Sequence, residues 1–503
     1  MTLPDFAAPE SNTQKYKDWA VTVRKRQPPP RFEDYLSGWK EFFDHYSQQA
    51  ETWNRRNRGY HANIERLMSF YVTPNSRVLE IGCATGDLLA ATKPAIGVGI
   101  DISKEMVRIA GKKYPTMTFH EMAAEELDLP NQEFDYIILS DMVGFLFDIK
   151  LVFQGLRQVC HPDTRIVLHW YSQLWQPFLT LAEALGLKYP QPLLNWTTVE
   201  DIQNLLYLTD HDIICRRSYI LLPKRVPVLS GVVNRYLSQL PILRHLCLTN
   251  WVIARPIALP EKKKPVTVSV ICPCRNEEGN IENIARRLPN MGAHTELIFV
   301  EGHSRDNTLA ECYRVRDNVD KDIKVFVQKG KGKGDAVRLG FSEASGDILM
   351  ILDADISVYP EDLPQFIEAL VNRKGEFING SRLVYLMDQK AMRFLNLLGN
   401  KFFALLLSRL LGQTVKDTLC GTKVLWSAKY KELVQGRSYF GNFDPFGDFD
   451  LLFGAAKLNL KIVEVPVRYR QRTYGTTNIS RFSHGFLLLR MCLVAARKLF
   501  FLD

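Results

Sequence analysis

The chain lacks the cysteine patterns and the long apolar runs that mark several large classes of protein. Its nine cysteines include no CxxC pair, which argues against a structural zinc site and against a disulfide framework. No stretch reaches the ~18 uncharged apolar residues that a membrane-spanning helix requires. The opening residues, MTLPDFAAPESNTQKYKDWA, contain no basic segment followed by an apolar one, so the pattern of a secretory signal is missing. From these absences we predict a reduced, cytoplasmic location.

The length and the net charge of the chain further limit the class of protein to which it can belong. The 503 residues are enough for two to four domains, and 46% hydrophobic with 24% charged residues is ordinary for a globular protein. The net charge of +9 is mild for this length. It suggests a partner that carries negative charge, such as a phosphate, a nucleotide or a lipid headgroup, without requiring nucleic acid. We therefore expect no nucleic-acid partner.

Two α/β segments follow one another along the chain. Strand-like runs alternate with helical patterns on both sides of a connector, ARPIALPEKKKPVTV, which holds three prolines and three consecutive lysines. The expected strands are RVLEIG, VGIDI, YIILS and RIVLHW, then VTVSVIC, ELIFVE, KVFVQ, DILMILDAD and FINGS. Such alternation predicts parallel sheets covered by helices, and hence an α/β chain with two doubly wound domains. The predicted parts are an N-terminal arm or lid (1–44), a first domain (45–258), a linker (259–265) and a second domain (266–503).

The first domain opens with a glycine turn, RVLEIGCATGDLL, between a strand and a helix. Its glycines, Gly82 and Gly86, lack the GxGxxG spacing that lets the backbone approach a pyrophosphate. Glu80 lies near the end of the strand before the turn, and Asp101 closes the next strand, where a carboxylate can accept both hydroxyls of a ribose. A GxxxG turn also occurs where a strand simply joins a helix. Together, however, these residues favour S-adenosylmethionine over NAD as the ligand.

Over the region from residue 45 to about residue 220, the sequence resembles the class I S-adenosylmethionine-dependent methyltransferases. The resemblance implies that the glycine turn lines the cofactor, that Asp101 binds ribose, and that the AAEEL segment flanks the adenine. The cofactor-binding residues that it implies are Glu80, Gly82, Gly86, Asp101 and Glu125.

The same segment departs from the family at two positions and has no obvious base. Ala84 stands where the family usually has the middle glycine, and Ala123 where an aspartate is common. Methyl transfer needs an acceptor held in line, with a base if the acceptor is a hydroxyl. His169, at the end of RIVLHW, is the candidate base, and His61 lies in the N-terminal helical region. A histidine at such a position is more often structural, so both interpretations of His169 stay open.

The second domain contains an apolar strand that ends in two aspartates, DILMILDADIS. The chain has other DxD pairs, at 210–212, 320–322 and 448–450, but only Asp353 and Asp355 follow a long apolar run. That position places two carboxylates at the C-terminal edge of a sheet, where ligands bind in α/β folds. Hard oxygen ligands there suit Mg²⁺ or Mn²⁺ bridging a diphosphate, whereas aspartates that only cap a turn are the simpler alternative. We predict a metal site at Asp353 and Asp355.

From residue 265 to residue 485 the sequence resembles the family 2 glycosyltransferases of GT-A fold, and among them the dolichol- or polyprenyl-phosphate sugar synthases. The motifs that carry this resemblance are VSVICPCRNEEGNI, VEGHSRDNT, KGKGDAVRLGF, NGSR, DTLCGTK and RTYGTTNI. The resemblance implies inverting transfer from a UDP- or GDP-sugar. The nucleotide-sugar site that it implies is built from Pro273, Asn276, Glu277, Glu301, Lys331, Lys333, Asp353 and Arg472.

The acceptor of this transfer is less defined. Asp450 stands where the family usually has a glutamate, and it or Asp448 is the candidate base if the acceptor is a hydroxyl. A phosphate acceptor is already anionic and needs no strong base. Two positions depart from the family. At residues 301 and 302, a glutamate and a glycine stand where two aspartates are usual. Asn478 replaces the usual lysine, and this loss of a cation weakens the case for a phosphate acceptor.

Three segments combine dense apolar residues with basic ones, at 228–248, 390–412 and 480–503. Such faces suit the surface of an anionic membrane, although packing against the protein's own core is their commoner use. Both interpretations stay open. The first would allow a polyprenyl-phosphate or other lipid-linked acceptor, and peripheral association at the inner face of a membrane.

Three hypotheses for the whole chain follow. The main one is a bifunctional enzyme that transfers a sugar with its second half and methylates an acceptor with its first. The second retains the glycosyltransferase but makes the first half a non-catalytic docking module, as Ala84, Ala123 and the missing base suggest. The third is a soluble enzyme that tailors a small natural product with both halves.

Overall fold

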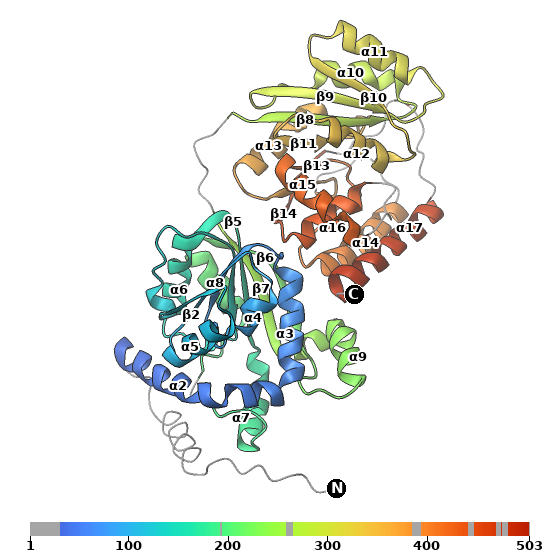
Figure 1. The fold of residues 1–503 in the computed structure, drawn as a ribbon. Helices are drawn as coiled ribbons and strands as arrows, with labels where there is room; N and C mark the ends of the chain where they lie inside the picture. The colour runs from blue at the N-terminus through green and yellow to red at the C-terminus, as the bar shows by residue number, and fades with distance from the viewer. Residues whose placement is uncertain are drawn as a thin grey trace. The chain divides into compact units, whose positions relative to one another are not determined.

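The chain divides into two compact units, residues 1–257 and 258–503, each with its own sheet (Figure 1). The computed structural model describes residues 31–191, 194–257, 265–384, 394–440, 447–468, 474 and 481–501. Residues 1–30 of the predicted arm and 259–264 of the predicted linker lie outside these ranges, and the predicted domain limits remain predictions. Among the described residues, no helix combines the length and the apolar character needed to cross a bilayer.

The first unit is built on a seven-stranded sheet in the order β3-β2-β1-β4-β5-β7-β6. Its strands are β1 (Arg77–Ile81), β2 (Ile96–Asp101), β3 (Thr118–Glu121), β4 (Phe134–Ser140), β5 (Cys160–Tyr171), β6 (His211–Tyr219) and β7 (Thr249–Pro256). Its helices are α2 (Phe32–Arg56), α3 (Arg58–Tyr71), α4 (Asp87–Ala91), α5 (Lys104–Lys113), α6 (Ile149–Leu156), α7 (Gln176–Ala184), α8 (Val199–Leu208) and α9 (Leu229–Arg235). The expected strands of this half are all present.

The strand order of the first unit reverses between β1 and β4. The chain runs outward from β1 to β3 and then returns to β4 on the other side of β1, so these two parallel neighbours form the switch point of the sheet. Ligands in such sheets bind beyond the C-terminal ends of the strands at this point. The four expected strands, β1, β2, β4 and β5, pair in parallel as predicted. Strand β7 was not predicted, and it pairs antiparallel with both β5 and β6.

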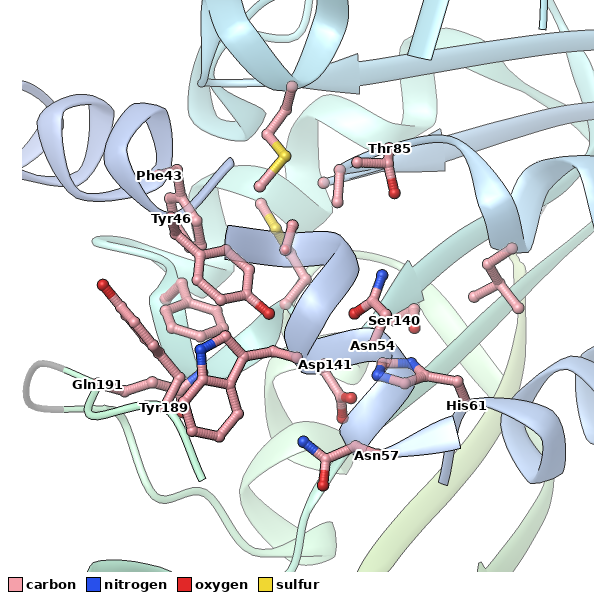
Figure 2. Close-up of a pocket in the computed structure, with 18 of the residues that line it drawn as sticks. Phe43, Tyr46, Asn54, Asn57, His61, Thr85, Ser140, Asp141, Tyr189 and Gln191 are labelled. Carbon is pink, nitrogen blue, oxygen red and sulfur yellow. The ribbon is translucent and has the colours of Figure 1, made fainter. Parts of the chain in front are cut away.

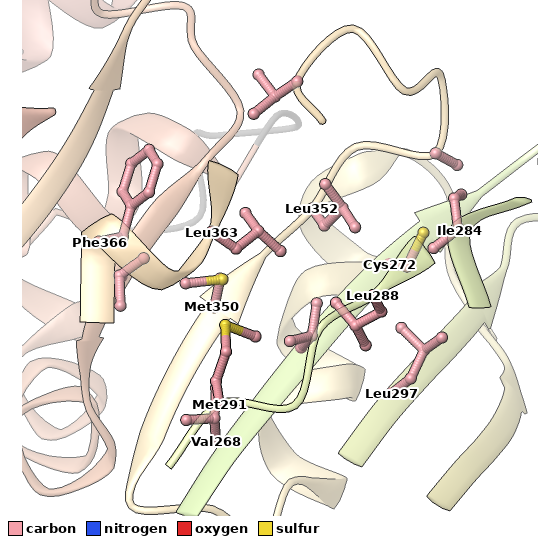
Figure 3. Packing of buried hydrophobic residues seen from close by; sticks show 14 of the residues in the cluster. Val268, Cys272, Ile284, Leu288, Met291, Leu297, Met350, Leu352, Leu363 and Phe366 are labelled. Atoms are coloured by element: carbon pink, nitrogen blue, oxygen red, sulfur yellow. The ribbon is translucent and has the colours of Figure 1, made fainter. Parts of the chain in front are cut away.

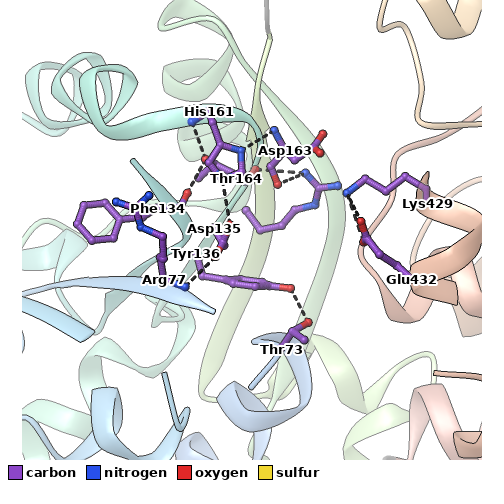
Figure 4. A network of polar contacts seen from close by, with 11 residues as sticks. Thr73, Arg77, Phe134, Asp135, Tyr136, His161, Asp163, Thr164, Lys429 and Glu432 are labelled. Carbon is purple, nitrogen blue, oxygen red and sulfur yellow. Dashed lines mark hydrogen bonds and ion pairs between the residues drawn. The ribbon is translucent and has the colours of Figure 1, made fainter. Parts of the chain in front are cut away.

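Polar contacts also hold the sheet together at the N-terminal ends of its central strands (Figure 4). The Asp135 carboxylate accepts a hydrogen bond from the Arg77 backbone N–H at 2.7 Å and lies 3.1 Å from His161 Nε2. The Thr164 hydroxyl donates to the Phe134 carbonyl at 2.6 Å. These contacts join the starts of β1, β4 and β5, and so fix the frame from which the C-terminal ends project.

The second unit has a seven-stranded sheet in the order β10-β9-β8-β11-β13-β12-β14. Its strands are β8 (Thr267–Cys274), β9 (His294–Glu301), β10 (Asp322–Val327), β11 (Ile348–Ile351), β12 (Phe377–Ser381), β13 (Lys423–Trp426) and β14 (Ile462–Pro466). Its helices are α10 (Glu278–Arg287), α11 (Thr308–Asn318), α12 (Lys333–Glu343), α13 (Pro364–Val371), α14 (Phe394–Leu411), α15 (Ser427–Gln435), α16 (Asp448–Lys457) and α17 (Arg481–Ala495). The switch point lies between β8 and β11, which pair in parallel, while β13 is antiparallel to β11 and β12.

The core of the second unit explains why its strands read as continuous apolar runs. Val268 and Cys272 of β8 and Met350 of β11 are fully buried, and they pack against Leu288 and Phe366 from the helical layers (Figure 3). Strands that are covered on both faces need apolar residues at successive positions. The polar residues that follow directly after such strands therefore stand out as the part of the chain available for chemistry.

Candidate active sites

A cavity of about 1110 Å³ lies at the switch point of the first unit (Figure 2). Its walls come from α2, α3, the glycine turn, the residues after β4 and the segment around Tyr189. Pockets for small ligands are ordinarily ~300–1,000 Å³, so this cavity is slightly larger than the usual range. Within the predicted arm, residues 32–44 belong to helix α2, which forms one wall of the cavity.

The glycine turn has the left-handed backbone that its sequence requires. Gly82 and Gly86 have φ of 73° and 78°, and a Cβ at Gly82 would overlap the Met142 sulfur. Ala84 also has a positive φ, 44°, which explains why the related family prefers glycine there. Gly82 and Ala84 line the cavity, whereas Gly86 lies at the N-terminus of α4 and shapes the turn without lining it. The predicted contact of Gly86 with the cofactor stays a prediction.

Three predicted acids line this cavity: Glu80, Asp101 and Glu125. Asp101 connects the glycine turn to the loop after β2, because its carboxylate accepts hydrogen bonds from the backbone N–H groups of Ala84 and Ser103, both at 2.9 Å. Burial, together with the charge of Asp44, raises the pKa of Asp101 to about 6. Burial also raises the pKa of Glu125, whose carboxylate accepts from a backbone N–H at 2.8 Å.

Glu80 is the most unusual of the three. Its side chain is 2% exposed, and its Oε2 has no hydrogen-bond partner among the residues that the structure describes. Burial, with the nearby charges of Asp101 and Asp87, raises the pKa of Glu80 well above its ordinary value. A buried polar atom without a partner is costly unless a ligand satisfies it. The Glu80 carboxyl therefore suits a ligand that carries hydrogen-bond donors.

The predicted base His169 does not reach the cavity. Its imidazole is fully buried, stacks on Trp251, and contacts Ser140 Oγ at 2.7 Å and Asp141 Oδ1 at 3.3 Å. Ser140 and Asp141 line the cavity and His169 lies behind them. His169 is therefore placed to orient these two residues, and its predicted role as a base stays a prediction.

The polar side of the cavity is formed by residues that the sequence did not single out as a group (Figure 2). Asp141, with a positive φ of 52°, accepts a hydrogen bond of 2.6 Å from the Tyr60 hydroxyl. His61 also lines the cavity, and burial lowers its pKa, so the imidazole is neutral at physiological pH and able to accept a proton. The facing wall is aromatic, with Tyr46 and Tyr189 at a ring separation of 4.9 Å.

In the second unit a residue after β11 belongs to a partly buried cluster of charged side chains. The Lys333 ammonium lies 2.7 Å from Asp353 Oδ1 and 3.6 Å from Asp448 Oδ2, so residues from α12, the DxD segment and α16 meet here. Fully buried Lys423 lies 3.8 Å from Asp448. Burial alone would raise the pKa of Asp353, but the Lys333 charge more than offsets this and lowers it. The pKa of Lys333 is raised in turn by Asp353 and Asp448, against the effect of its burial.

The predicted nucleotide residues lie at the C-terminal ends of β8 and β9. Asn276, with φ of 56°, accepts from the Arg305 N–H at 2.8 Å, and its own N–H donates to the Ser304 hydroxyl at 3.0 Å. Glu301 is buried and accepts from the Ser304 N–H. The remaining predicted residues here are Pro273, half-buried in β8, Glu277, buried and bound to Asn280, and Lys331, exposed before α12.

The two candidate bases have different surroundings. Asp448 belongs to the cluster around Lys333, whereas the buried Asp450 pairs with Arg437 at 2.7 Å. Asp448 is therefore the candidate that the structure joins to the DxD residues. Arg472, predicted to face anionic oxygens, lies outside the described residues.

The DxD carboxylates suit a hard divalent cation by the nature of their donors. Asp355 is 9% exposed and accepts from the Ser357 N–H at 3.0 Å, an arrangement that fixes the direction of its carboxylate. No group of three or more metal-binding side chains occurs among the residues that the structure describes. Mg²⁺ typically binds to one or two carboxylates and takes its other ligands from water and substrate phosphate, so two aspartates are sufficient.

Gly421, in the DTLCGTK motif, allows the backbone to approach the aspartates. A Cβ at this position would overlap the Asp353 carboxylate. We expect Gly421→Ala to displace Asp353 and to lower glycosyl transfer about a hundredfold, since a shift of ~1 Å at a reacting site costs that much. Gly436→Ala is the matched control, because its Cβ would lie no nearer than 3.7 Å from any neighbour. Equal activity of both variants would show that this close approach is not needed.

Comparisons with known proteins identify both halves. The family model "Methyltransferase domain" matches residues 78–163, and the model "Glycosyl transferase family 2" matches residues 269–433. A dolichol-phosphate mannosyltransferase of Pyrococcus furiosus is 31% identical over 42% of this chain and 59% of that protein. A UDP-N-acetylglucosamine–dolichyl-phosphate N-acetylglucosaminyltransferase of Methanococcus voltae is 25% identical over 44% of this chain and 92% of that protein.

The extent of these similarities is limited. A dolichol-phosphate mannosyltransferase of Saccharomyces cerevisiae is 34% identical over 21% of this chain, and the chain spans only 41% of that protein's length. Among solved structures, a SAM-dependent methyltransferase from Thermotoga maritima has a TM-score of 0.34 at 14% identity, covering 43% of this chain and 98% of that one. The family models are the firmer finding. The chain contains a methyltransferase domain followed by a family 2 glycosyl transferase domain, both of them enzyme domains of the transferase class.

Proposed function

We propose that this protein is a bifunctional enzyme. Its second unit transfers a sugar, with inversion, from a nucleotide-diphosphate donor, and its first unit methylates an acceptor with S-adenosylmethionine. The observation that carries the proposal is that each unit has its own set of buried polar groups at the switch point of its own sheet. Ligand-binding sites of α/β folds lie at this position.

In the second unit we assign the nucleoside to the C-terminal ends of β8 and β9, beside Asn276, Glu277 and Glu301. The Lys333 ammonium supplies a fixed positive charge beside Asp353, where the donor's diphosphate oxygens would lie. A divalent cation bound by Asp353 and Asp355 would stabilise negative charge on the departing nucleoside diphosphate. For a hydroxyl acceptor, Asp448 is the group placed to take the proton, while a phosphate acceptor needs none.

The acceptor that we propose for this transfer is lipid-linked, most simply a polyprenyl phosphate. Support comes from the relatives, whose names include dolichol-phosphate and dolichyl-phosphate transferases. Further support comes from α14 and α17, which bury one face at Leu407 and Met491 and expose Leu405 and Leu493 on another. Exposed apolar side chains on basic helices favour peripheral attachment to a membrane.

In the first unit we assign the S-adenosylmethionine ribose to Asp101, its adenine to the vicinity of Glu125, and its donor groups to the unpartnered Glu80 oxygen. S-adenosylmethionine supplies the methyl group. The acceptor would lie in the remaining space beside Asp141 and His61. Either can receive a proton there, and Tyr60 holds the Asp141 carboxylate in place.

The proposal is tested with both donors on the full-length chain. Radiolabelled UDP- or GDP-sugar with polyprenyl phosphate and Mn²⁺ should give a labelled lipid that is lost with EDTA. Methyl-labelled S-adenosylmethionine should label either that product or a membrane lipid extract. If S-adenosylhomocysteine does not bind, the first unit is a docking module and the proposal fails for that half.

A further inference from the structure

One side of the first unit exposes many large apolar side chains. The α7–α9 surface, as we name it, consists of the exposed apolar residues in the segments 174–187 and 226–246. They are Leu174, Phe178, Leu181, Leu185, Leu187, Val226, Val228, Leu229, Val232, Tyr236, Leu237, Leu240, Ile242 and Leu246. Single exposed apolar residues are common, but a concentration of this size on two short segments marks an interaction site.

The two segments are neighbours, because hydrogen bonds join them at two places. Trp175 Nε1 donates to the Leu246 carbonyl at 2.8 Å, just before α7 begins. After α7 ends, the Lys224 ammonium donates to the Leu187 carbonyl at 3.3 Å. Helices α7 and α9 both lie on the periphery of the unit, away from its sheet (Figure 1).

The charge of this surface has one sign. Residues 213–257 contain no aspartate or glutamate, and within them Lys224, Arg225 and Arg244 are exposed. The acid of α7, Glu183, is turned inward and pairs with Lys188 at 2.7 Å, with only 8% of its side chain exposed. Apolar side chains among cations, without anions, match a surface that offers acyl chains beneath negative headgroups.

The same surface borders the cavity of the first unit. Phe178 and Leu187 line the cavity and are 61% and 50% exposed. Trp175, Leu179 and Lys224 line it as well. The cavity therefore opens at the α7–α9 surface, and an apolar molecule lying against that surface could enter without crossing bulk water.

We propose that the first unit docks on the surface of an anionic lipid bilayer through the α7–α9 surface, which brings the mouth of its cavity to the lipid. Side chains such as Leu185 and Ile242 enter the interface, while Arg225 and Arg244 meet the headgroups. The methyl acceptor is then a lipid-borne molecule. That last step rests on the proposed methyl transfer, whereas the docking itself does not.

The test is co-sedimentation of the full-length protein with vesicles, either of phosphatidylcholine alone or of equal parts phosphatidylcholine and phosphatidylglycerol. We expect the protein to partition onto the anionic vesicles, and the double variant Leu185→Asp/Ile242→Asp to lower this partition at least about tenfold. Both positions are well exposed, at 64% and 80%, and neither lines the cavity. Tyr207→Asp, also exposed but on α8, should leave the partition unchanged.

A second experiment distinguishes binding through this surface from binding through the helices of the other unit. Leu405→Asp on α14 changes an equally exposed leucine and should have a smaller effect than the double variant. The proposal is overturned if the protein ignores anionic vesicles, if it binds both vesicle types equally, or if only Leu405→Asp releases it. It is also overturned if the protein is a dimer that the double variant converts to a monomer, since the surface would then be an interface between copies. Binding of S-adenosylhomocysteine, measured on the same variants, reports separately on the proposed methyl transfer.

Discussion

Asp355→Ala is expected to abolish glycosyl transfer, with a fall of about a thousandfold or more in kcat/KM. Asp355 is a nearly buried carboxylate directly after β11, and the Ser357 N–H fixes its direction. In the proposed reaction Asp355, together with Asp353, would hold the cation that stabilises the departing diphosphate. The measurement is the rate of sugar transfer from the nucleotide donor across a range of Mn²⁺ concentrations.

The control for this prediction is another DxD pair in the same unit. Asp320 also begins an Asp-x-Asp sequence but is exposed and lies just before β10. Asp320→Ala should keep full activity. Asp355→Ala should still show the thermal shift of the first unit with S-adenosylhomocysteine, which verifies that the chain is folded. Near-normal transfer by Asp355→Ala would remove the DxD segment from the site.

Asp101→Ala is expected to weaken the binding of S-adenosylhomocysteine about a hundredfold or more. The carboxylate would accept both ribose hydroxyls, and hydrogen bonds to a charged group are worth ~1.5–3 kcal/mol each. The substitution also releases the N–H groups of Ala84 and Ser103, which Asp101 holds in place around the glycine turn. Isothermal titration calorimetry measures the change, and Asp128→Ala, an exposed aspartate of the same unit, should bind normally.

The raised pKa of Asp101 adds a pH dependence to this prediction. With a pKa of about 6 in the folded protein, Asp101 is ionised above pH 6 and protonated below it. Affinity for S-adenosylhomocysteine should therefore be constant above pH 6 and fall below it, by at most about tenfold per pH unit. Asp101→Asn should bind weakly without this step. An unchanged step in Asp101→Asn would assign the titration to another group.

The sequence predicted those parts of the molecule that depend on neighbouring residues. The glycine turn and the DxD segment follow apolar strands directly, so their place at a sheet edge could be inferred from local pattern alone. The direction of the antiparallel strands β7 and β13 could not be inferred in this way, because a buried strand has the same apolar composition in either direction.

The contacts between the site residues could not be predicted from the local sequence pattern, for a different reason. Lys333 was expected to face a diphosphate, but it also pairs with Asp353 and with Asp448, which lies more than a hundred positions further along the chain. His169 was placed correctly near a strand end, yet the sequence does not show which neighbours cover a side chain there. The aromatic residues of α2, such as Trp39 and Phe43, had a visible helical spacing. Only the fold shows that this face lines the cavity.

In the proposed function, the chain carries two independent ligand sites, one in each unit. The most direct test is thermal unfolding of the full-length protein with S-adenosylhomocysteine, UDP or GDP, each with and without Mn²⁺. A ligand at 100 times its dissociation constant stabilises the unit that binds it by about 2.7 kcal/mol. We predict that S-adenosylhomocysteine raises one unfolding step regardless of Mn²⁺, and that one of the two nucleotides raises the other step only with Mn²⁺. Absence of any shift with S-adenosylhomocysteine, or a nucleotide shift that ignores Mn²⁺, would contradict the account.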